Sequence, residues 1–299
     1  MTRSVTFLRP TSVAEAVAML AEHGEDAKVV AGSTALTIML RQGLIEPAAL
    51  VSIGRLADDG LRAITRDGDS LRIGALVTHR AVERDPLVRE TVPVLAETFA
   101  RVANIRVRNQ ATVGGVVAEA DYASDPPAVL LALDAVIEVT GPDGAREVPV
   151  ADFFLAFYTT ALAPAELVTA VRVPIPPAGT HAVYHRFVTR SSEDRPCVGA
   201  CGIARLGPDG RALDARLSIG AAAEVPQRFP ELEAALIGTA LEAADLRRIA
   251  DGYAERIDTL DDMRGSAWYR REMVRVWGRR ALESARDAAR GWTATVPQA

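Results

Sequence analysis

The stretch that decides the fold is Thr112-Val-Gly-Gly-Val-Val-Ala-Glu-Ala-Asp-Tyr-Ala-Ser-Asp125. Two prolines and an apolar run from Ala128 to Leu133 follow it. Paired glycines let a backbone approach where a Cβ would collide, and they can present consecutive N–H groups to an anion. A glycine turn before a capped helix explains the pattern equally well, because short glycine motifs are weak signals on their own.

A second glycine turn favours the ligand interpretation. Residues 29–36 read Val-Val-Ala-Gly-Ser-Thr-Ala-Leu, which predicts a buried strand, a turn at Gly32 and a helix start. Ser33 or Thr34 is the candidate N-cap of that helix. A helix N-terminus behind a glycine turn is suited to a phosphate group. Two such turns in one chain indicate a ligand with a diphosphate.

Together the two motifs resemble those of the FAD-binding medium subunit of the molybdenum hydroxylases. The first family motif reads Ala-Gly-Gly-x-Ser/Thr, and Ala31-Gly32-Ser33-Thr34 corresponds to it here. The second reads Thr-Ile/Val-Gly-Gly-Asn followed by Ser/Asn-Asp-Pro, and Thr112 to Val116 and Ser124-Asp125-Pro126 correspond to it. Ser33 replaces the second glycine and Val116 replaces the asparagine, so either the affinity for FAD is weaker or backbone groups carry more of the binding.

The resemblance implies an α+β fold with two domains. An FAD-binding domain of the vanillyl-alcohol-oxidase/PCMH type is expected over residues 1–177, with lobes at about 1–55 and 56–177. An α+β C-terminal domain with a three-stranded antiparallel sheet plus helices is expected over 178–290, followed by a tail at 291–299. Pro174, Pro176 and Pro177 mark the boundary in the sequence.

Local patterns predict the elements of both domains. Ser12 and Glu15 form a capping-box pattern, and Asp67-Gly68 and Pro142-Asp143-Gly144 are hairpin signals. A single helical stripe is expected over 88–102, and Asp152 is expected to cap a short helix containing residues 153, 154 and 157. Strands are expected at 182–188, 197–206 and 213–220, with helices at 231–237, 243–257 and 266–289.

The implied cofactor is one non-covalent FAD, because neither motif holds a His or Cys that could attach the flavin. The diphosphate is expected against the backbone N–H groups of Gly32 to Leu36 and of Gly114 to Val116. The full predicted site consists of Val29, Val30, Ala31, Gly32, Ser33, Thr34, Ala35, Leu36, Val102, Ala103, Thr112, Gly114, Gly115, Val116, Ala118, Ser124, Asp125 and Leu167. No catalytic residue and no metal ligand set is predicted.

Composition gives no reason to expect nucleic acid or a membrane as partner. The formal net charge is −5, and no window holds eighteen uncharged apolar residues. No signal peptide is expected, and the two cysteines, Cys197 and Cys201, are expected as buried thiols in the cytoplasm. Two cysteines cannot hold an iron–sulfur cluster, which needs four ligands.

The resemblance therefore implies an electron-transfer subunit of an oxidoreductase. It would receive electrons on FAD from the [2Fe–2S] clusters of a small subunit and pass them to an external acceptor. A molybdopterin-containing large subunit would hold the substrate, and the assembly is expected as a dimer of heterotrimers. Residues 104–110 are the expected partner surface. Arg190 and Arg195 could face the flavin, although a solvated loop explains them better. Two alternatives remain: a free-standing flavin oxidase, and a flavin-free nucleotide-binding or scaffold protein.

Overall fold

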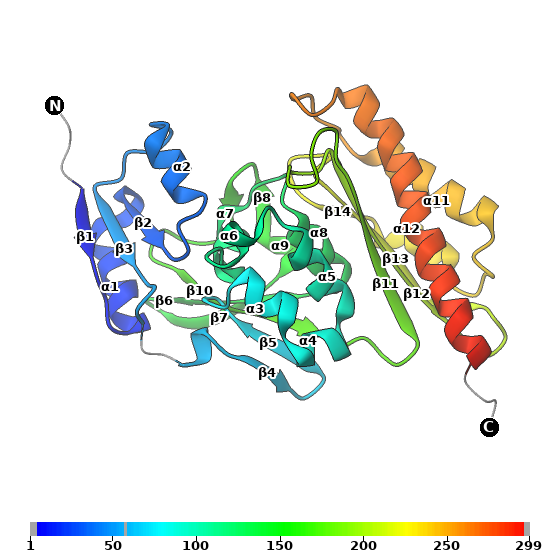
Figure 1. Cartoon of the computed structure of the whole chain (residues 1–299), viewed down its shortest axis with the longest axis horizontal. Helices are drawn as coiled ribbons and strands as arrows, with labels where there is room; N and C mark the ends of the chain where they lie inside the picture. The colour runs from blue at the N-terminus through cyan, green and yellow to red at the C-terminus, as the bar shows by residue number, and fades with distance from the viewer. Residues whose placement is uncertain (1–4, 57–58, 296–299) are drawn as a thin grey trace.

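A computed structural model describes residues 5–56 and 59–295. Three units, each with its own hydrophobic core, follow one another along the long axis of the molecule (Figure 1). Lobe 1 lies at the N-terminal end, lobe 2 in the middle, and the C-terminal domain at the other end.

Lobe 1 is a small parallel sheet with helices. Its strands pair in the order β1-β3-β2. The capping pattern is confirmed, since Ser12 Oγ accepts from Glu15 N at 3.1 Å, and Gly24 ends the helix with φ 56°. The elements are β1 (Thr6–Leu8), α1 (Val13–His23), the single turn η1 (Gly24–Asp26), β2 (Ala27–Val30), α2 (Leu36–Arg41) and β3 (Ala49–Ser52).

Lobe 2 is built on a five-stranded antiparallel sheet of order β4-β5-β10-β6-β7. Its strands are β4 (Ile64–Asp67), β5 (Ser70–Gly74), β6 (Val136–Gly141), β7 (Gly144–Pro149) and β10 (Leu167–Pro174), with a separate hairpin of β8 (Phe154–Ala156) and β9 (Thr159–Thr160). Its helices are η2 (Asp59–Leu61), α3 (His79–Arg84), α4 (Pro86–Thr91), α5 (Pro93–Arg101), α6 (Ile105–Arg108), α7 (Val113–Glu119), α8 (Asp125–Ala132) and α9 (Val150–Phe153). Both predicted hairpins are confirmed.

The C-terminal domain is an antiparallel sheet of order β11-β12-β13-β14 with helices on its outer face (Figure 1). Its elements are β11 (Thr180–Phe187), β12 (Val198–Leu206), β13 (Ala212–Gly220), β14 (Gln227–Arg228), α10 (Pro230–Glu233), η3 (Ala234–Leu236), α11 (Ala243–Arg256) and α12 (Ala267–Thr295). At Gly202 a Cβ would lie 2.4 Å from the Ala281 carbonyl, so glycine permits the close packing of α12 on β12.

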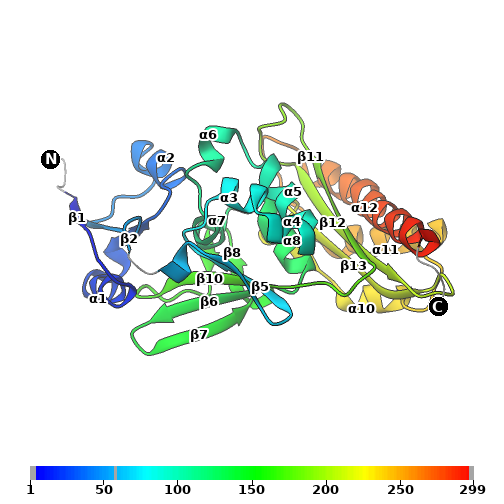
Figure 2. The same ribbon diagram turned by 60° about the horizontal axis from the view of Figure 1, so that its bottom comes forward.

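The inner face of this sheet packs on lobe 2. Helix α8 contacts β12 and β13, and α5 contacts β11, which places both helices between the two sheets (Figure 2). Ser218 Oγ donates to the Ala128 carbonyl at 2.5 Å, and a Cβ on Gly220 would lie 2.8 Å from Ala128 Cβ. The start of α8, which is the end of the second motif, is therefore fixed by both domains.

Four local expectations differ from the structure. The C-terminal sheet has a fourth strand, β14, among the described residues. The stripe at 88–102 is two helices, because Pro93 lacks an N–H and begins α5 anew. The aromatic helix ends at Phe153, since the chain extends from Phe154 into β8. Helix α12 continues into the predicted tail as far as Thr295, and residues 296–299 lie outside the described range.

None of the helices within the described ranges is both long and apolar enough to cross a membrane.

Candidate functional site

The turn at Gly32 touches the segment that leads into the second motif. A Cβ on Gly32 would lie 2.0 Å from the Gln110 carbonyl oxygen and 3.0 Å from Ala111 Cα. Only glycine allows two backbones to approach so closely. The structure therefore brings the two motifs together.

The first turn leaves a row of backbone donors available. Within the described residues, 5–56 and 59–295, the N–H groups of Gly32 to Leu36 have no hydrogen-bond acceptor. The predicted N-cap is wrong, because α2 begins at Leu36 behind Ala35 and the Ser33 hydroxyl pairs with the Thr37 hydroxyl at 2.8 Å. Unused consecutive N–H groups in a turn form an anion-binding concavity. These donors fit a diphosphate.

The second motif uses its donors differently. Gly114 N donates to the Ala75 carbonyl at 2.9 Å, Gly115 N to Thr112 Oγ1 at 3.1 Å, and Val116 N to the Thr112 carbonyl at 3.0 Å. The expectation that these three N–H groups are free for the diphosphate is therefore wrong. Gly114 and Gly115 matter instead because they lack a Cβ, and a Cβ on each would meet different neighbours.

Gly114 faces the protein and Gly115 faces outward. A Cβ on Gly114 would lie 2.6 Å from Ala75 Cβ and 3.0 Å from its Cα. A Cβ on Gly115 would meet only the Thr112 side chain within 4 Å, at 2.8 Å from Oγ1. Gly114 thus fixes α7 on lobe 2, while Gly115 keeps one face of the helix start open to a ligand.

The end of the second motif is tied to the C-terminal domain. Asp125 Oδ1 accepts from the Tyr184 hydroxyl at 2.8 Å and lies 3.1 Å from Arg186 Nε. Burial raises the pKa of Asp125 to about 6 against the opposing effects of Arg186 and Tyr184. The carboxylate is almost fully buried, so Asp125 joins the domains whatever further contact it makes with a cofactor.

The other predicted site residues occupy three settings. Val102 and Ala103 follow α5, and their carbonyls accept from Arg108 at 3.1 and 2.9 Å. Leu167 is buried at the start of β10 in the core cluster of lobe 1. Val116 is buried in the core of lobe 2, Ala118 is exposed, and Ser124 precedes α8 without a side-chain cap bond.

Left-handed backbone conformations gather around this region. Ser33, Ala103, Ala120 and Tyr158 all have positive φ, between 44° and 59°. Such conformations cost free energy in residues with a Cβ, and they cluster at functional sites where the surrounding structure enforces them. These left-handed residues lie in the same region as the glycines of the two motifs.

Sequence reasoning missed the role of the loop at 188–197. Arg195 Nη2 lies 2.5 Å from Asp121 Oδ2 and 3.5 Å from Glu119 Oε1, so the loop is fastened to the second motif. Asn104 Nδ2 donates to Glu193 Oε2 of the same loop at 3.5 Å. Arg190 and Arg195 are both exposed, as expected for a solvated loop, but Arg195 also pairs with the second motif.

A fully buried arginine holds the loops behind this contact. Arg270 donates to the carbonyls of Cys197 and Ala221 and to Asp262 Oδ1. Asp262 Oδ2 in turn accepts from the Tyr122 hydroxyl of the second motif at 2.6 Å. These bonds lower the pKa of Asp262 to about 2, against the effect of its partial burial. No sequence pattern predicts this network, because its residues are far apart in the chain.

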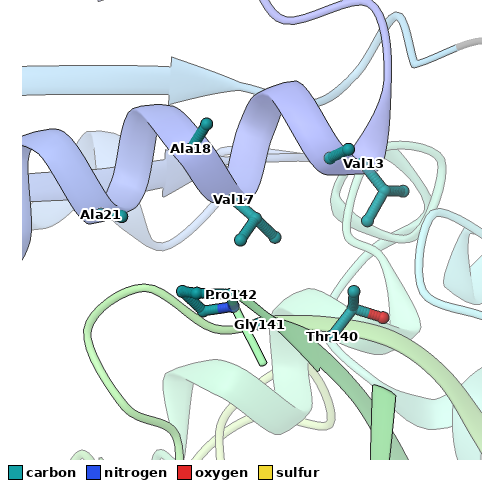
Figure 3. A pocket seen from close by; sticks show the side chains of 8 residues that line it. Val13, Val17, Ala18, Ala21, Thr140, Gly141 and Pro142 are labelled. Carbon is teal, nitrogen blue, oxygen red and sulfur yellow. The ribbon is translucent and has the colours of Figure 1, made fainter. Parts of the chain in front are cut away.

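An apolar groove of 520 Å³ lies elsewhere, between α1 and the β6–β7 turn (Figure 3). Val13 and Val17 point across it toward Thr140 and Pro142. Its walls carry few polar groups, and it does not include either motif. Among the described residues, no three His, Cys, Asp or Glu side chains are placed to hold a metal ion.

Comparison with known families decides what the two domains are. Residues 3–176 match the family described as the FAD binding domain in molybdopterin dehydrogenase, and residues 183–285 match the CO dehydrogenase flavoprotein C-terminal domain. The chain belongs to this family of FAD-binding medium subunits. FAD is therefore its cofactor, and the free donors at Gly32 to Leu36 fit that cofactor's diphosphate.

Individual relatives agree over nearly their whole length. The carbon monoxide dehydrogenase medium chain of Afipia carboxidovorans is 34% identical, with 96% of this chain and 98% of the relative covered. The 6-hydroxypseudooxynicotine dehydrogenase complex subunit alpha of Paenarthrobacter nicotinovorans is 32% identical, with 96% of each covered. A chain of reconstituted CO dehydrogenase from Oligotropha carboxidovorans matches with a TM-score of 0.92 at 32% identity, covering 96% of this chain and 99% of that one. These medium subunits belong to oxidoreductases.

Proposed function

We propose that this chain is the electron-transfer subunit of a molybdenum- and iron–sulfur-containing hydroxylase. Bound FAD would supply the redox chemistry, accepting electrons from [2Fe–2S] clusters and yielding them to an external acceptor. The chain's own residues bind and orient the cofactor. The free N–H groups of Gly32 to Leu36 hold its diphosphate, and Gly115 leaves room beside α7.

The names of the relatives support a separate substrate subunit. Medium chains named for carbon monoxide, nicotine and glyceraldehyde oxidation are all 31–34% identical to this one. Such different substrates require different binding sites, yet the three medium chains are about equally similar in sequence to this chain. The substrate therefore belongs to a molybdopterin-containing large subunit, and a small subunit supplies the iron–sulfur clusters. We place the assembly, a dimer of heterotrimers, in the cytoplasm, where buried thiols such as Cys197 and Cys201 stay reduced.

The observation that carries the proposal is the row of free donors at Gly32 to Leu36, inside the first of two domains that both match the medium-subunit family. The purified chain should hold one non-covalent FAD that dithionite reduces, and it should turn over no purine, aldehyde or carbon monoxide. Co-expression with its iron–sulfur and large subunits should give a complex containing molybdenum, iron and FAD. Oxidation of an organic substrate by the lone chain at about 1–1000 per second would support a free-standing oxidase instead.

Gly115→Val is expected to remove FAD while the fold is kept. The new side chain would occupy the open face of α7, and within the chain its Cβ would meet the Thr112 hydroxyl, a cap worth about 1 kcal/mol. Gly114→Val should instead unfold lobe 2, because its Cβ meets the Ala75 backbone. FAD content and far-UV circular dichroism separate the two outcomes.

The control for this pair is Gly291→Val near the end of α12, where a Cβ meets nothing within 4 Å. It should retain both flavin and fold. Equal FAD content in wild type and Gly115→Val would contradict the close approach of the cofactor at this glycine.

A further inference from the structure

Helix α3 holds the segment that leads into the second motif through two side chains of one helix face. His79 and Glu83 are four residues apart and therefore lie on the same side of α3. His79 Nε2 lies 3.2 Å from the Thr112 carbonyl oxygen, and Glu83 Oε2 accepts from Arg108 Nε at 3.1 Å. The Glu83 and Arg108 side chains are only 14% and 13% exposed. Residues 108–112 are thus attached to α3 at both ends.

The first glycine turn rests on this same segment. The Gly32 backbone lies directly against the Gln110 carbonyl and Ala111. The Ala111 carbonyl accepts from His79 N at 2.9 Å, and the next carbonyl, that of Thr112, accepts from the His79 ring. The backbone and the side chain of one residue of α3 therefore hold the two carbonyls that follow the contact with Gly32. Thr112 is also the N-cap of α7, so the bond to its carbonyl bears on both motifs.

His79 is a costly residue for a position that needs only a packed ring. It is 2% exposed and meets the Phe99 ring edge-on, with ring centroids 4.8 Å apart. Because a carbonyl only accepts, Nε2 carries the proton, and Nδ1 has no hydrogen-bond partner within the described part of the chain. Burial lowers the pKa of His79 to about 4, and the charge of Arg108 acts in the same direction. The ring is therefore neutral, and its unpartnered nitrogen costs free energy that a phenylalanine would not.

We propose that His79 is a positioning residue of the FAD site. The inference rests on the proposed contact between the FAD diphosphate and the free N–H groups of Gly32 to Leu36. The Nε2–H group fixes the Thr112 carbonyl, and with it the backbone of residues 110–112. Gly32 and the donors that follow it take their position from that backbone. His79 thus acts on the cofactor through the chain and not by touching it.

His79→Phe separates this role from a contribution to stability. Phenylalanine keeps a ring against Phe99, and it removes both the donor to Thr112 and the unpartnered Nδ1. Urea unfolding of the FAD-free protein should therefore stay close to that of the wild type. The dissociation constant for FAD, measured by flavin fluorescence, should rise roughly 2- to 10-fold, the effect of one lost hydrogen bond. An unchanged FAD affinity, or a loss of affinity no larger than the loss of stability, would overturn the proposal.

His79→Gln is the rescue variant. The glutamine amide nitrogen is separated from Cβ by the same number of bonds as the imidazole Nε2, so it can donate to the Thr112 carbonyl again. This variant should recover part of the FAD affinity that His79→Phe loses.

The matched control is Thr98→Val. Thr98 is fully buried next to Phe99, and its hydroxyl donates to the Val94 carbonyl of its own helix at 2.7 Å. The variant loses one buried hydrogen bond to a carbonyl, as His79→Phe does, but this bond does not reach residues 108–112. It should bind FAD with wild-type affinity. A loss equal to that of His79→Phe would mean that any bond lost in this core weakens FAD binding, and would overturn the proposal.

A double variant with Gly32→Ala tests the route. Both substitutions disturb the contact between the first turn and residues 110–112, so their effects on FAD affinity should not add. His79→Phe should therefore cost less affinity in Gly32→Ala than in the wild type. Additive losses would overturn the route through Gly32. If Gly32→Ala alone left FAD affinity unchanged, the failure would lie in the proposed placement of the diphosphate.

The wild-type protein offers a further readout that needs no variant. Exchange of the His79 Nε2 proton with solvent can be followed by NMR of protein labelled with ¹⁵N-histidine, and contact with the Phe99 ring identifies the signal. Coupling is reciprocal, so saturating FAD should slow this exchange by the same factor, roughly 2- to 10-fold. Equal exchange rates with and without FAD would overturn the proposal, even if His79→Phe failed to fold.

Discussion

Gly32→Ala is expected to weaken FAD binding more than any other single methyl group added to the chain. The new Cβ would lie 2.0 Å from the Gln110 carbonyl oxygen and 2.7 Å from its carbon, and backbone atoms cannot rotate away. Lobe 1 must then move off the second motif, so the free donors of the first turn lose their position. Overpacking of this kind costs about 1–3 kcal/mol, roughly 5- to 150-fold in affinity.

Titration of the FAD-free protein with FAD, followed by flavin fluorescence, measures this loss. The control is Gly54→Ala in the same lobe, where a Cβ meets nothing within 4 Å and φ is not left-handed. It should bind FAD as the wild type does. Wild-type affinity in Gly32→Ala would mean that the two motifs need not touch for the cofactor to bind.

Asp125→Ala is expected to destabilise the protein by about 3–5 kcal/mol, because it leaves the buried Arg186 without its carboxylate and removes the acceptor of the Tyr184 hydroxyl. The loss should appear in urea unfolding both with and without FAD. Proteolysis between β10 and β11, at residues 175–179, should become faster as the domains separate.

The control for Asp125 is Glu147→Ala. Glu147 also pairs with an arginine, Arg172, but its side chain is 52% exposed, so its loss should cost less than about 1 kcal/mol. If Asp125→Ala lowered FAD affinity without changing the stability of the FAD-free protein, Asp125 would be a cofactor ligand and not a connection between domains.

Much of the fold follows from local signals that were readable in the sequence. Ser12 and Glu15 cap α1, and Asp67-Gly68 turns β4 into β5. The helix expected at 266–289 is the larger part of α12, which packs on the C-terminal core. Each of these depends on neighbours within a few residues or on the period of an amphipathic helix. Pro93 shows the limit, because one residue divides a periodic stripe into two helices.

The site was only partly predictable, for a physical reason. Glycine at positions 32, 114 and 115 indicated close approach, but the group approached differs at each: the Gln110 backbone, Ala75 or the Thr112 side chain. Whether an N–H is free depends on tertiary acceptors such as the Ala75 carbonyl. Arg195 reaches a partner 76 residues away in the sequence, and no local pattern specifies that pairing.

The buried Arg270 would affect the speed of the proposed electron transfer. Its bonds hold the carbonyls of Cys197 and Ala221 and the Asp262 carboxylate in fixed directions behind the second motif. When charge arrives at a site whose surrounding dipoles are already fixed, little free energy is lost in reorienting them. A polar network that sequence patterns do not reveal would therefore lower the reorganisation energy of the flavin's surroundings and favour fast exchange in both directions.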